Sequence, residues 1–153
     1  MRVATETLEL RTDGRTGFTL VELMVVVAIV GILAAIAIPK FASLMRKSNE
    51  GACKGNLGAI RSALSIYYGD MEGQYPDYIE ALTVNGKYLT SIPPAYAAGY
   101  HPPHNNEQIS RVSAVISDFG GWFYDDLPAS GTYGQVVVNC VHTDTKGTVW
   151  SAY

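Results

Sequence analysis

The sequence predicts an α+β protein, in which a long N-terminal helix, embedded in a membrane along its first half, packs on a C-terminal antiparallel sheet of three or four strands. Three observations predict this fold. Residues 18–38 form a long apolar run that is uncharged apart from one glutamate. Residues 41–71 carry apolar side chains at steps of three and four, the period of an amphipathic helix. The later residues are rich in glycine, proline and tyrosine and alternate short apolar segments with turn residues, which favours strands.

The apolar run contains an unexpected charge at Glu22. Its 21 residues would span about 31 Å as a helix, close to the thickness of a bilayer's hydrocarbon core. A carboxylate in such a segment costs roughly 2.5–3.5 kcal/mol at the bilayer centre and less near an end. A signal peptide cleaved near residues 35–37 would have a shorter, uninterrupted apolar stretch, and a small domain cannot surround a core helix. A simple anchor explains the length but gives Glu22 no partner.

The residues that open the apolar run resemble a known processing signal. Residues 17–22, GFTLVE, precede an unbroken apolar stretch that contains Gly31 and ends at Pro39. This segment closely resembles the class III signal of type IV pilins and type II secretion pseudopilins, specifically over residues 14–41. In that family a membrane peptidase cuts after the glycine and methylates the new N-terminal residue. The resemblance implies cleavage between Gly17 and Phe18 by a prepilin peptidase and methyltransferase, and N-methylation of Phe18.

Cleavage would give Glu22 a partner. A cut after Gly17 leaves a cationic amine on Phe18, and a carboxylate four residues along lies one helical turn away. Glu22 would therefore pair with the amine of its own Phe18 or of an adjacent subunit in a filament. The desolvation costs are offset only when both charges are present, so the pair would set the height at which subunits dock.

Two residues predict a weak point in the helix. Gly31 disfavours the helix by about 1 kcal/mol relative to alanine. Pro39 removes an internal hydrogen bond and clashes with the preceding turn. Family members commonly loosen between such positions inside the filament, and the resemblance implies the same from Gly31 to Pro39. The alternative is a continuous helix that is kinked at Pro39.

Five segments make up the expected organisation, which matches the pilin fold. They are a leader (1–17), a transmembrane and assembly helix (18–38), the amphipathic second half of that helix (39–72), a variable connecting loop (73–108) and an antiparallel β region (109–153). The connecting loop should hold a short helix around residues 78–82 and a turn at Asn85-Gly86. Strands are expected at residues 112–117, 121–124, 135–140 and 148–153.

The charges do not indicate nucleic-acid binding. The net charge is −3, and no basic stripe is present of the kind that such binding needs. Five basic residues do follow the apolar run: Lys40, Arg46, Lys47, Lys54 and Arg61. They predict either a solvated helix face or a contact with anionic headgroups or with acidic groups of a neighbouring subunit.

The two cysteines, Cys53 and Cys140, leave two alternatives open. Cys53 lies on the predicted apolar stripe of the helix and Cys140 ends a predicted strand. In an oxidising compartment they could form a disulfide between helix and sheet, worth about 4–5 kcal/mol on the chain-entropy model. Otherwise they are two buried thiols.

No catalytic or cofactor site is predicted. His101 and His104 share a loop with no regular element to orient them, and His142 is distant in sequence, so we predict no metal site. Four aspartates fall in predicted turns, where they are common for backbone reasons: Asp118, Asp125, Asp126 and Asp144. The acidic, glycine-rich calcium pattern of some pseudopilins is not evident. No nucleophile or phosphate-loop motif appears, so the chain is not expected to be an enzyme.

The resemblance implies a structural subunit of a type IV pilus, which polymerises through its N-terminal helix into surface filaments for adhesion, motility or DNA uptake. One alternative is a type II secretion pseudopilin that forms a periplasmic piston. Another is a membrane-tethered periplasmic binding domain that uses residues 96–104 as its ligand surface. Expected partners are sister subunits in a helical filament, the prepilin peptidase, the membrane and an inner-membrane assembly platform.

The expected location changes with assembly. The chain would first cross the inner membrane once with its N-terminus in the cytoplasm, and then lie in an extracellular or periplasmic filament. The basic residues that follow the apolar run favour the opposite orientation. The motif carries more weight because dedicated machinery places family members in the membrane.

Overall fold

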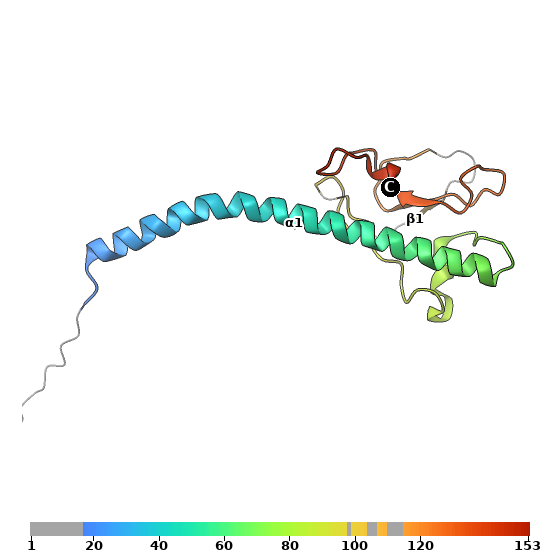
Figure 1. The fold of residues 1–153 in the computed structure, drawn as a ribbon, viewed down its shortest axis with the longest axis horizontal. Coiled ribbons are helices and arrows are strands. Elements are labelled where there is room, and N and C mark those ends of the chain that lie inside the picture. The colour runs from blue at the N-terminus through green and yellow to red at the C-terminus, as the bar shows by residue number, and fades with distance from the viewer. Residues whose placement is uncertain (1–16, 98, 104–106, 110–114) are drawn as a thin grey trace, which may run out of the picture. The chain divides into compact units, whose positions relative to one another are not determined.

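The structure, a computed structural model, describes residues 17–97, 99–103, 107–109 and 115–153 (Figure 1). It divides into two units, Met1–Lys40 and Phe41–Tyr153, which we describe separately. Helix α1 (Leu20–Asp70) supplies the helix of the first unit and continues as the first element of the second. A long N-terminal helix that precedes a small sheet confirms the predicted fold class.

The described part of the first unit is a single helical segment. α1 passes Gly31 and Pro39 without interruption. Pro39 has no N–H to donate, so the helix loses one internal hydrogen bond at this turn. The isolated chain thus has the continuous form of the helix, and loosening between Gly31 and Pro39 stays a prediction for the filament.

The core of the second unit forms against one face of α1. The helix contributes four large side chains at steps of three and four: Cys53, Leu57, Ile60 and Leu64. They pack in one cluster with Ile79, Leu82, Ile92, Trp122, Tyr124, Val136, Val138 and Trp150. The start of the predicted apolar stripe is not part of this core, because Phe41 is 66% exposed and Leu44 is 62% exposed. The stripe therefore becomes a core face only beyond residue 49.

A glycine ends α1. The N–H of Gly73 donates to the carbonyl of Tyr68 (2.9 Å) and Gly73 has a φ of 88°, a left-handed conformation that suits glycine after a helix end. The chain then forms the short 3-10 segment η1 (Ile79–Gly86), near the predicted short helix. Asn85 and the glycine after it both have positive φ, which confirms the predicted turn.

The sheet has three short strands in the order β1-β2-β3. β2 (Trp122–Tyr124) and β3 (Val136–Val138) pair antiparallel, and both lie within predicted strands. β1 (Glu107–Ile109) pairs parallel with β2, with Gln108 opposite Phe123. This differs from the expected antiparallel meander. The stretch of about a dozen residues between β1 and β2 is long enough for a parallel crossover.

The other two predicted strands are not found in the described residues. Residues 110–114 of the strand expected at 112–117 are outside the described ranges, and residues 115–117 are not in a strand. The prediction of a strand at 148–153 is wrong, because this segment forms the 3-10 turn η2 (Trp150–Ala152). The N–H of Trp150 donates to the carbonyl of His142 (3.0 Å) and that of Ser151 to Cys140 (3.2 Å), which curls the segment.

Asp125 organises the loop between β2 and β3. Its buried carboxylate accepts hydrogen bonds from the Ser130 and Thr132 hydroxyls (both 2.5 Å) and from the Leu127 N–H (3.0 Å). Burial alone would raise the pKa of Asp125, but these three donors outweigh burial and lower it. The ionised carboxylate is therefore part of the folded loop.

We expect Asp125→Asn to lower the free energy of unfolding at pH 7 by about 1–3 kcal/mol, because the amide cannot accept all three bonds. The folded-state pKa lies below the unfolded value of about 3.9, so the contribution of the charge is complete above that value and is lost as the pH falls through the folded-state pKa. Urea unfolding followed by tryptophan fluorescence should show the gap between wild type and variant closing below about pH 4. A gap that stays constant from neutral pH to pH 2 would contradict this role.

Candidate assembly site

The start of α1 is fixed by a capping box. The N–H and hydroxyl of Thr19 donate to Oε2 of Glu22 (2.9 and 2.7 Å), and the N–H of Glu22 donates to the Thr19 hydroxyl (3.2 Å). This reciprocal Thr-x-x-Glu arrangement satisfies backbone donors that have no partner within the helix. The same Thr-x-x-Glu spacing is visible in the sequence at residues 19–22. The carboxylate therefore has a structural partner already in the uncleaved chain.

The predicted partner of Glu22, the Phe18 amine, exists only after the bond between Gly17 and Phe18 is cut. Both residues lie just before α1 and are exposed. The two bonds from Thr19 converge on Oε2, which leaves Oε1 to accept from another group. Thr19 would remain after cleavage, so capping and charge pairing are compatible.

The first unit presents a continuous apolar surface. Phe18 is 75% exposed and Leu33 is 61% exposed, and the other large apolar residues between them are exposed to similar degrees. Among the described residues, α1 is the one helix long and apolar enough to cross a membrane. An apolar surface of this extent marks contact with lipid or with other protein chains.

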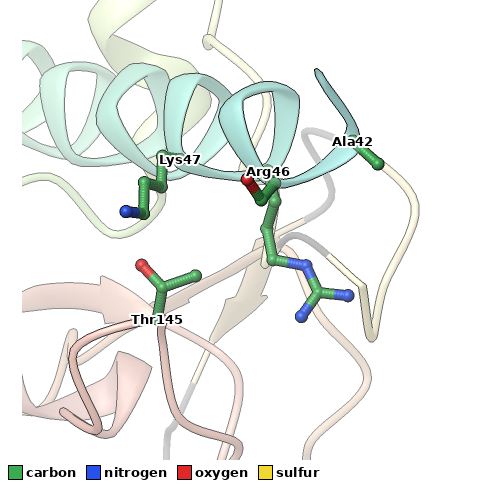
Figure 2. Close-up of a pocket in the computed structure, with 5 residues that line it drawn as sticks. Ala42, Arg46, Lys47 and Thr145 are labelled. Atoms are coloured by element: carbon green, nitrogen blue, oxygen red, sulfur yellow. The ribbon is translucent and has the colours of Figure 1, made fainter. Parts of the chain in front are cut away.

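Four of the basic residues that follow the apolar run lie in the second unit, and they divide into two groups. Arg46 and Lys47 are exposed and line an open pocket with Thr145 (Figure 2). Lys54 instead pairs with Asp144 (2.6 Å), and Arg61 donates to the carbonyls of Val136 and Tyr153. Lys54 is partly buried and binds the chain's own C-terminal segment, which neither predicted role describes. Arg61 stays exposed, as a solvated face predicts, but it also binds the chain's own backbone. Among these four residues, Arg46 and Lys47 are the exposed pair that forms no hydrogen bond or ion pair with the described C-terminal segment, so they could meet an external partner.

Asp144 is the centre of the attachment between α1 and the C-terminal segment. Its side chain is fully buried and accepts from Lys54, from the Tyr153 hydroxyl (2.6 Å) and from the N–H groups of Lys146 and Thr148. Burial alone would raise the pKa of Asp144, but these donors hold it well below its usual range. A second attachment lies one turn before Lys54 on α1, where the side chain of Glu50 accepts hydrogen bonds from the N–H and hydroxyl of Thr145 (3.0 and 2.6 Å).

We expect Lys54→Met to destabilise the second unit by about 3–5 kcal/mol, because Asp144 would keep a buried charge without its cation. Thermal unfolding of the full chain in detergent measures the effect. Lys47→Met is the matched control, since Lys47 is exposed on the same helix and should change stability by less than about 0.5 kcal/mol. Equal stabilities of the two variants would show that the ion pair does not fasten the segment.

The two cysteines are buried free thiols in the structure. Cys53 accepts a hydrogen bond from the N–H of Tyr96 (3.2 Å), and Cys140 lies 3.5 Å from Nδ1 of His142. Burial raises the pKa of both thiols, that of Cys140 to about 11. Of the two alternatives for Cys53 and Cys140, a disulfide or two buried thiols, the structure has the two thiols. The disulfide remains a prediction for oxidising conditions.

The structure also brings together residues that the sequence analysis had kept apart. The side chains of His101, Asp118, Cys140 and His142 form one cluster. From the sequence alone, His101 lies on a loop with no regular element to orient it, His142 is distant, and Asp118 is expected only as a turn residue. The Cys-x-His pair at the end of a strand was the local signal that could have suggested them. His104 lies outside the described residues.

Comparisons with known proteins give three kinds of relative. Residues 13–38 match the family model of the prokaryotic N-terminal methylation motif. The chain is 33% identical over 129 residues to the type IV major pilin protein PilA of Myxococcus xanthus, covering 84% of this chain and 49% of that protein. It is 44% identical over 80 residues to the fimbrial protein EcpC of Eikenella corrodens, covering 50% and 52%. It is 31% identical over 129 residues to the type II secretion system core protein G of Klebsiella michiganensis, covering 83% and 82%.

These matches differ in extent. The chain spans about half the length of PilA and EcpC, and most of core protein G. No solved structure matches it. The relatives are named as a pilin, a fimbrial protein and a secretion-system core protein, not as enzymes, in agreement with the prediction of a non-enzymatic protein. With a methylation motif at its N-terminal helix and a relative matched over most of its length, the chain belongs to the family of type IV pilins and type II secretion pseudopilins.

Proposed function

We propose that this chain is the structural subunit of a type IV pilus and that it polymerises through residues 18–38. The observation that carries the proposal is the exposed apolar surface at the start of α1, where Glu22 is the one charged residue between positions 18 and 38. Burying such a surface between sister helices would supply the main attraction, at roughly 25 cal/mol per Å² of apolar area. The names of the pilin and fimbrial relatives support a role in a pilus.

The steps of assembly follow from the same residues. A prepilin peptidase removes residues 1–17 and methylates Phe18, and the resulting amine pairs with Glu22 of the same or a neighbouring subunit. Before assembly the chain crosses the inner membrane once with its N-terminus in the cytoplasm. An assembly platform in that membrane then adds it to a filament.

A type II secretion pseudopilin is the second candidate. The match to core protein G favours it, because it covers 82% of that protein, whereas the match to PilA covers 49% of PilA. A pseudopilin would use the same helix and the same processing, but in a short periplasmic filament. The apolar helix alone therefore does not distinguish the two functions.

Deleting the gene in its native host separates the two candidates. A pilus subunit should appear in filaments sheared from the cell surface, and its loss should remove those filaments without changing the set of secreted proteins. A pseudopilin should be absent from the sheared fraction, and its loss should block secretion. If neither filaments nor secretion change and the chain stays unprocessed in the membrane, both functions fail and the tethered binding domain remains.

A further inference from the structure

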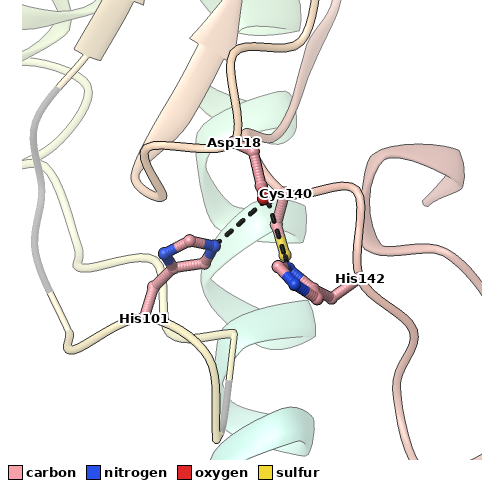
Figure 3. A group of neighbouring side chains, drawn as sticks. All are labelled: His101, Asp118, Cys140 and His142. Atoms are coloured by element: carbon pink, nitrogen blue, oxygen red, sulfur yellow. Dashed lines mark hydrogen bonds and ion pairs between the residues drawn. The ribbon is translucent and has the colours of Figure 1, made fainter.

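The four clustered side chains come from three separate segments (Figure 3). His101 belongs to the connecting loop, Asp118 to the turn before β2, and Cys140 and His142 to the segment after β3. One ligand atom from each side chain lies within 4.8 Å of all the others. The loop and both ends of the β2-β3 hairpin therefore converge on one point.

The distances between these atoms match a tetrahedral metal site. Oδ1 of Asp118 lies 3.2 Å from Nε2 of His101 and 3.3 Å from Nδ1 of His142, which lies 3.5 Å from Sγ of Cys140. Zinc binds nitrogen and oxygen at about 2.0–2.2 Å and sulfur at about 2.3 Å, so the edges of its tetrahedron measure about 3.3–3.6 Å. Three edges are thus already close to the required lengths. The longest separation, at most 4.8 Å, needs a shift of about 1 Å, within the reach of a side-chain rotation.

The donor types select a transition metal. Two imidazoles, a thiolate and a carboxylate suit zinc, whereas calcium and magnesium prefer sites made entirely of oxygen. The thiolate and the carboxylate together balance the charge of a divalent ion. The Cys140 thiol would release its proton to solvent when the metal binds.

Neighbouring groups hold the ligands in place. The Val141 N–H donates to Oδ1 of Asp118 (2.9 Å), and Oδ1 of the fully buried Asn139 accepts from the N–H groups of Ser117 and Asp118 (2.9 and 3.3 Å). The ring of His142 stacks on Tyr100, with centroids 4.1 Å apart. Such contacts orient ligands before a metal arrives.

We propose that His101, Asp118, Cys140 and His142 bind one zinc ion, which fastens the connecting loop to the segments that flank the sheet. The ion would replace the hydrogen-bonded contacts between Asp118 and the two imidazoles with a cross-link among the three segments. Zinc binding and a Cys53–Cys140 disulfide exclude each other, because both need the sulfur of Cys140. The inference does not depend on whether the filament is a pilus or a pseudopilus.

Metal titration of the full chain tests the proposal. The chain is purified in detergent under reducing conditions without a polyhistidine tag, because such a tag would itself bind the probe ions. Zinc is counted by mass spectrometry of the metal. Cobalt serves as a second probe, since tetrahedral coordination and a bond to thiolate each give a distinct visible or near-ultraviolet absorption. We expect one equivalent of metal per chain and the cobalt–thiolate band.

Two variants and one control complete the test. Cys140→Ser should abolish the cobalt–thiolate band, and His142→Gln should weaken zinc affinity by more than about 100-fold, beyond the 10- to 100-fold effects of outer groups. His142 is only half-buried, so its variant decides the question if Cys140→Ser fails to fold. Cys53→Ser removes the other thiol and should leave both readouts unchanged. Less than one equivalent of zinc in the wild type, or unchanged affinity in His142→Gln, overturns the proposal.

Discussion

Replacing Glu22 with leucine should exclude the chain from filaments while leaving the second unit folded. After cleavage the Phe18 amine is a cation at the start of an apolar helix, and burial without a counter-charge costs about 3–5 kcal/mol. That penalty corresponds to a loss of at least about 100-fold in incorporation. The measurement is the ratio of variant to wild-type chain in sheared fractions when both are expressed together.

Because Glu22 also takes part in the capping box, control variants must separate the effect of its charge from the effect of its hydrogen bonds. Glutamine at position 22 keeps the hydrogen bonds with Thr19 but carries no charge. If charge pairing governs assembly, Glu22→Gln should fail as Glu22→Leu does. If Glu22 acts only through the capping box, Glu22→Gln should assemble normally and Thr19→Val, which removes the capping hydroxyl, should fail. Normal assembly of Glu22→Leu would contradict both explanations, charge pairing and capping.

Gly134→Ala should strongly destabilise the second unit. Gly134 has a φ of 79°, and a methyl group there would lie 2.3 Å from Cε2 of Tyr75. The left-handed backbone costs about 1–2 kcal/mol for alanine, and the overlap about 1–3 kcal/mol more. Tyr75 cannot easily yield, because its ring packs between Tyr68 and Tyr133, with centroids 4.5 and 5.2 Å away. Thermal unfolding monitored by circular dichroism measures the loss.

Gly147→Ala separates the two causes. Gly147 also has a positive φ, 83°, but a methyl group there meets no atom within 4 Å. Its variant should lose only the conformational part, about 1–2 kcal/mol. Equal losses in the two variants would mean that Tyr75 moves aside and that the close contact contributes nothing.

The sequence predicted the elements whose signal is local. The 3.6-residue period identified the core face of α1 at Cys53, Leu57, Ile60 and Leu64 before any partner was known. The predicted turn at Asn85 and Gly86 was confirmed, because the conformational preferences of these residues act within two positions. The strands at 121–124 and 135–140 were found, although β2 and β3 are shorter.

What the sequence did not predict depends on contacts between distant segments. The parallel pairing of β1 with β2 depends on which segments meet in the fold, and no periodic pattern in the sequence encodes that. The last segment reads as a strand locally, but bonds to the carbonyls of Cys140 and His142 curl it. Lys54 looked like a surface charge because its partner Asp144 lies 90 residues along the chain. The cluster of His101, Asp118, Cys140 and His142 was missed for the same reason.

The intact mass of the chain from sheared-filament and membrane fractions of its native host tests the central claim most directly. We predict a chain that has lost residues 1–17, begins at Phe18 and carries the mass of one added methyl group. Full-length protein in both fractions would contradict processing and return the chain to a tethered domain. A chain that begins at Ile38 would instead mark residues 1–37 as a secretory signal peptide, and assembly through α1 would be excluded.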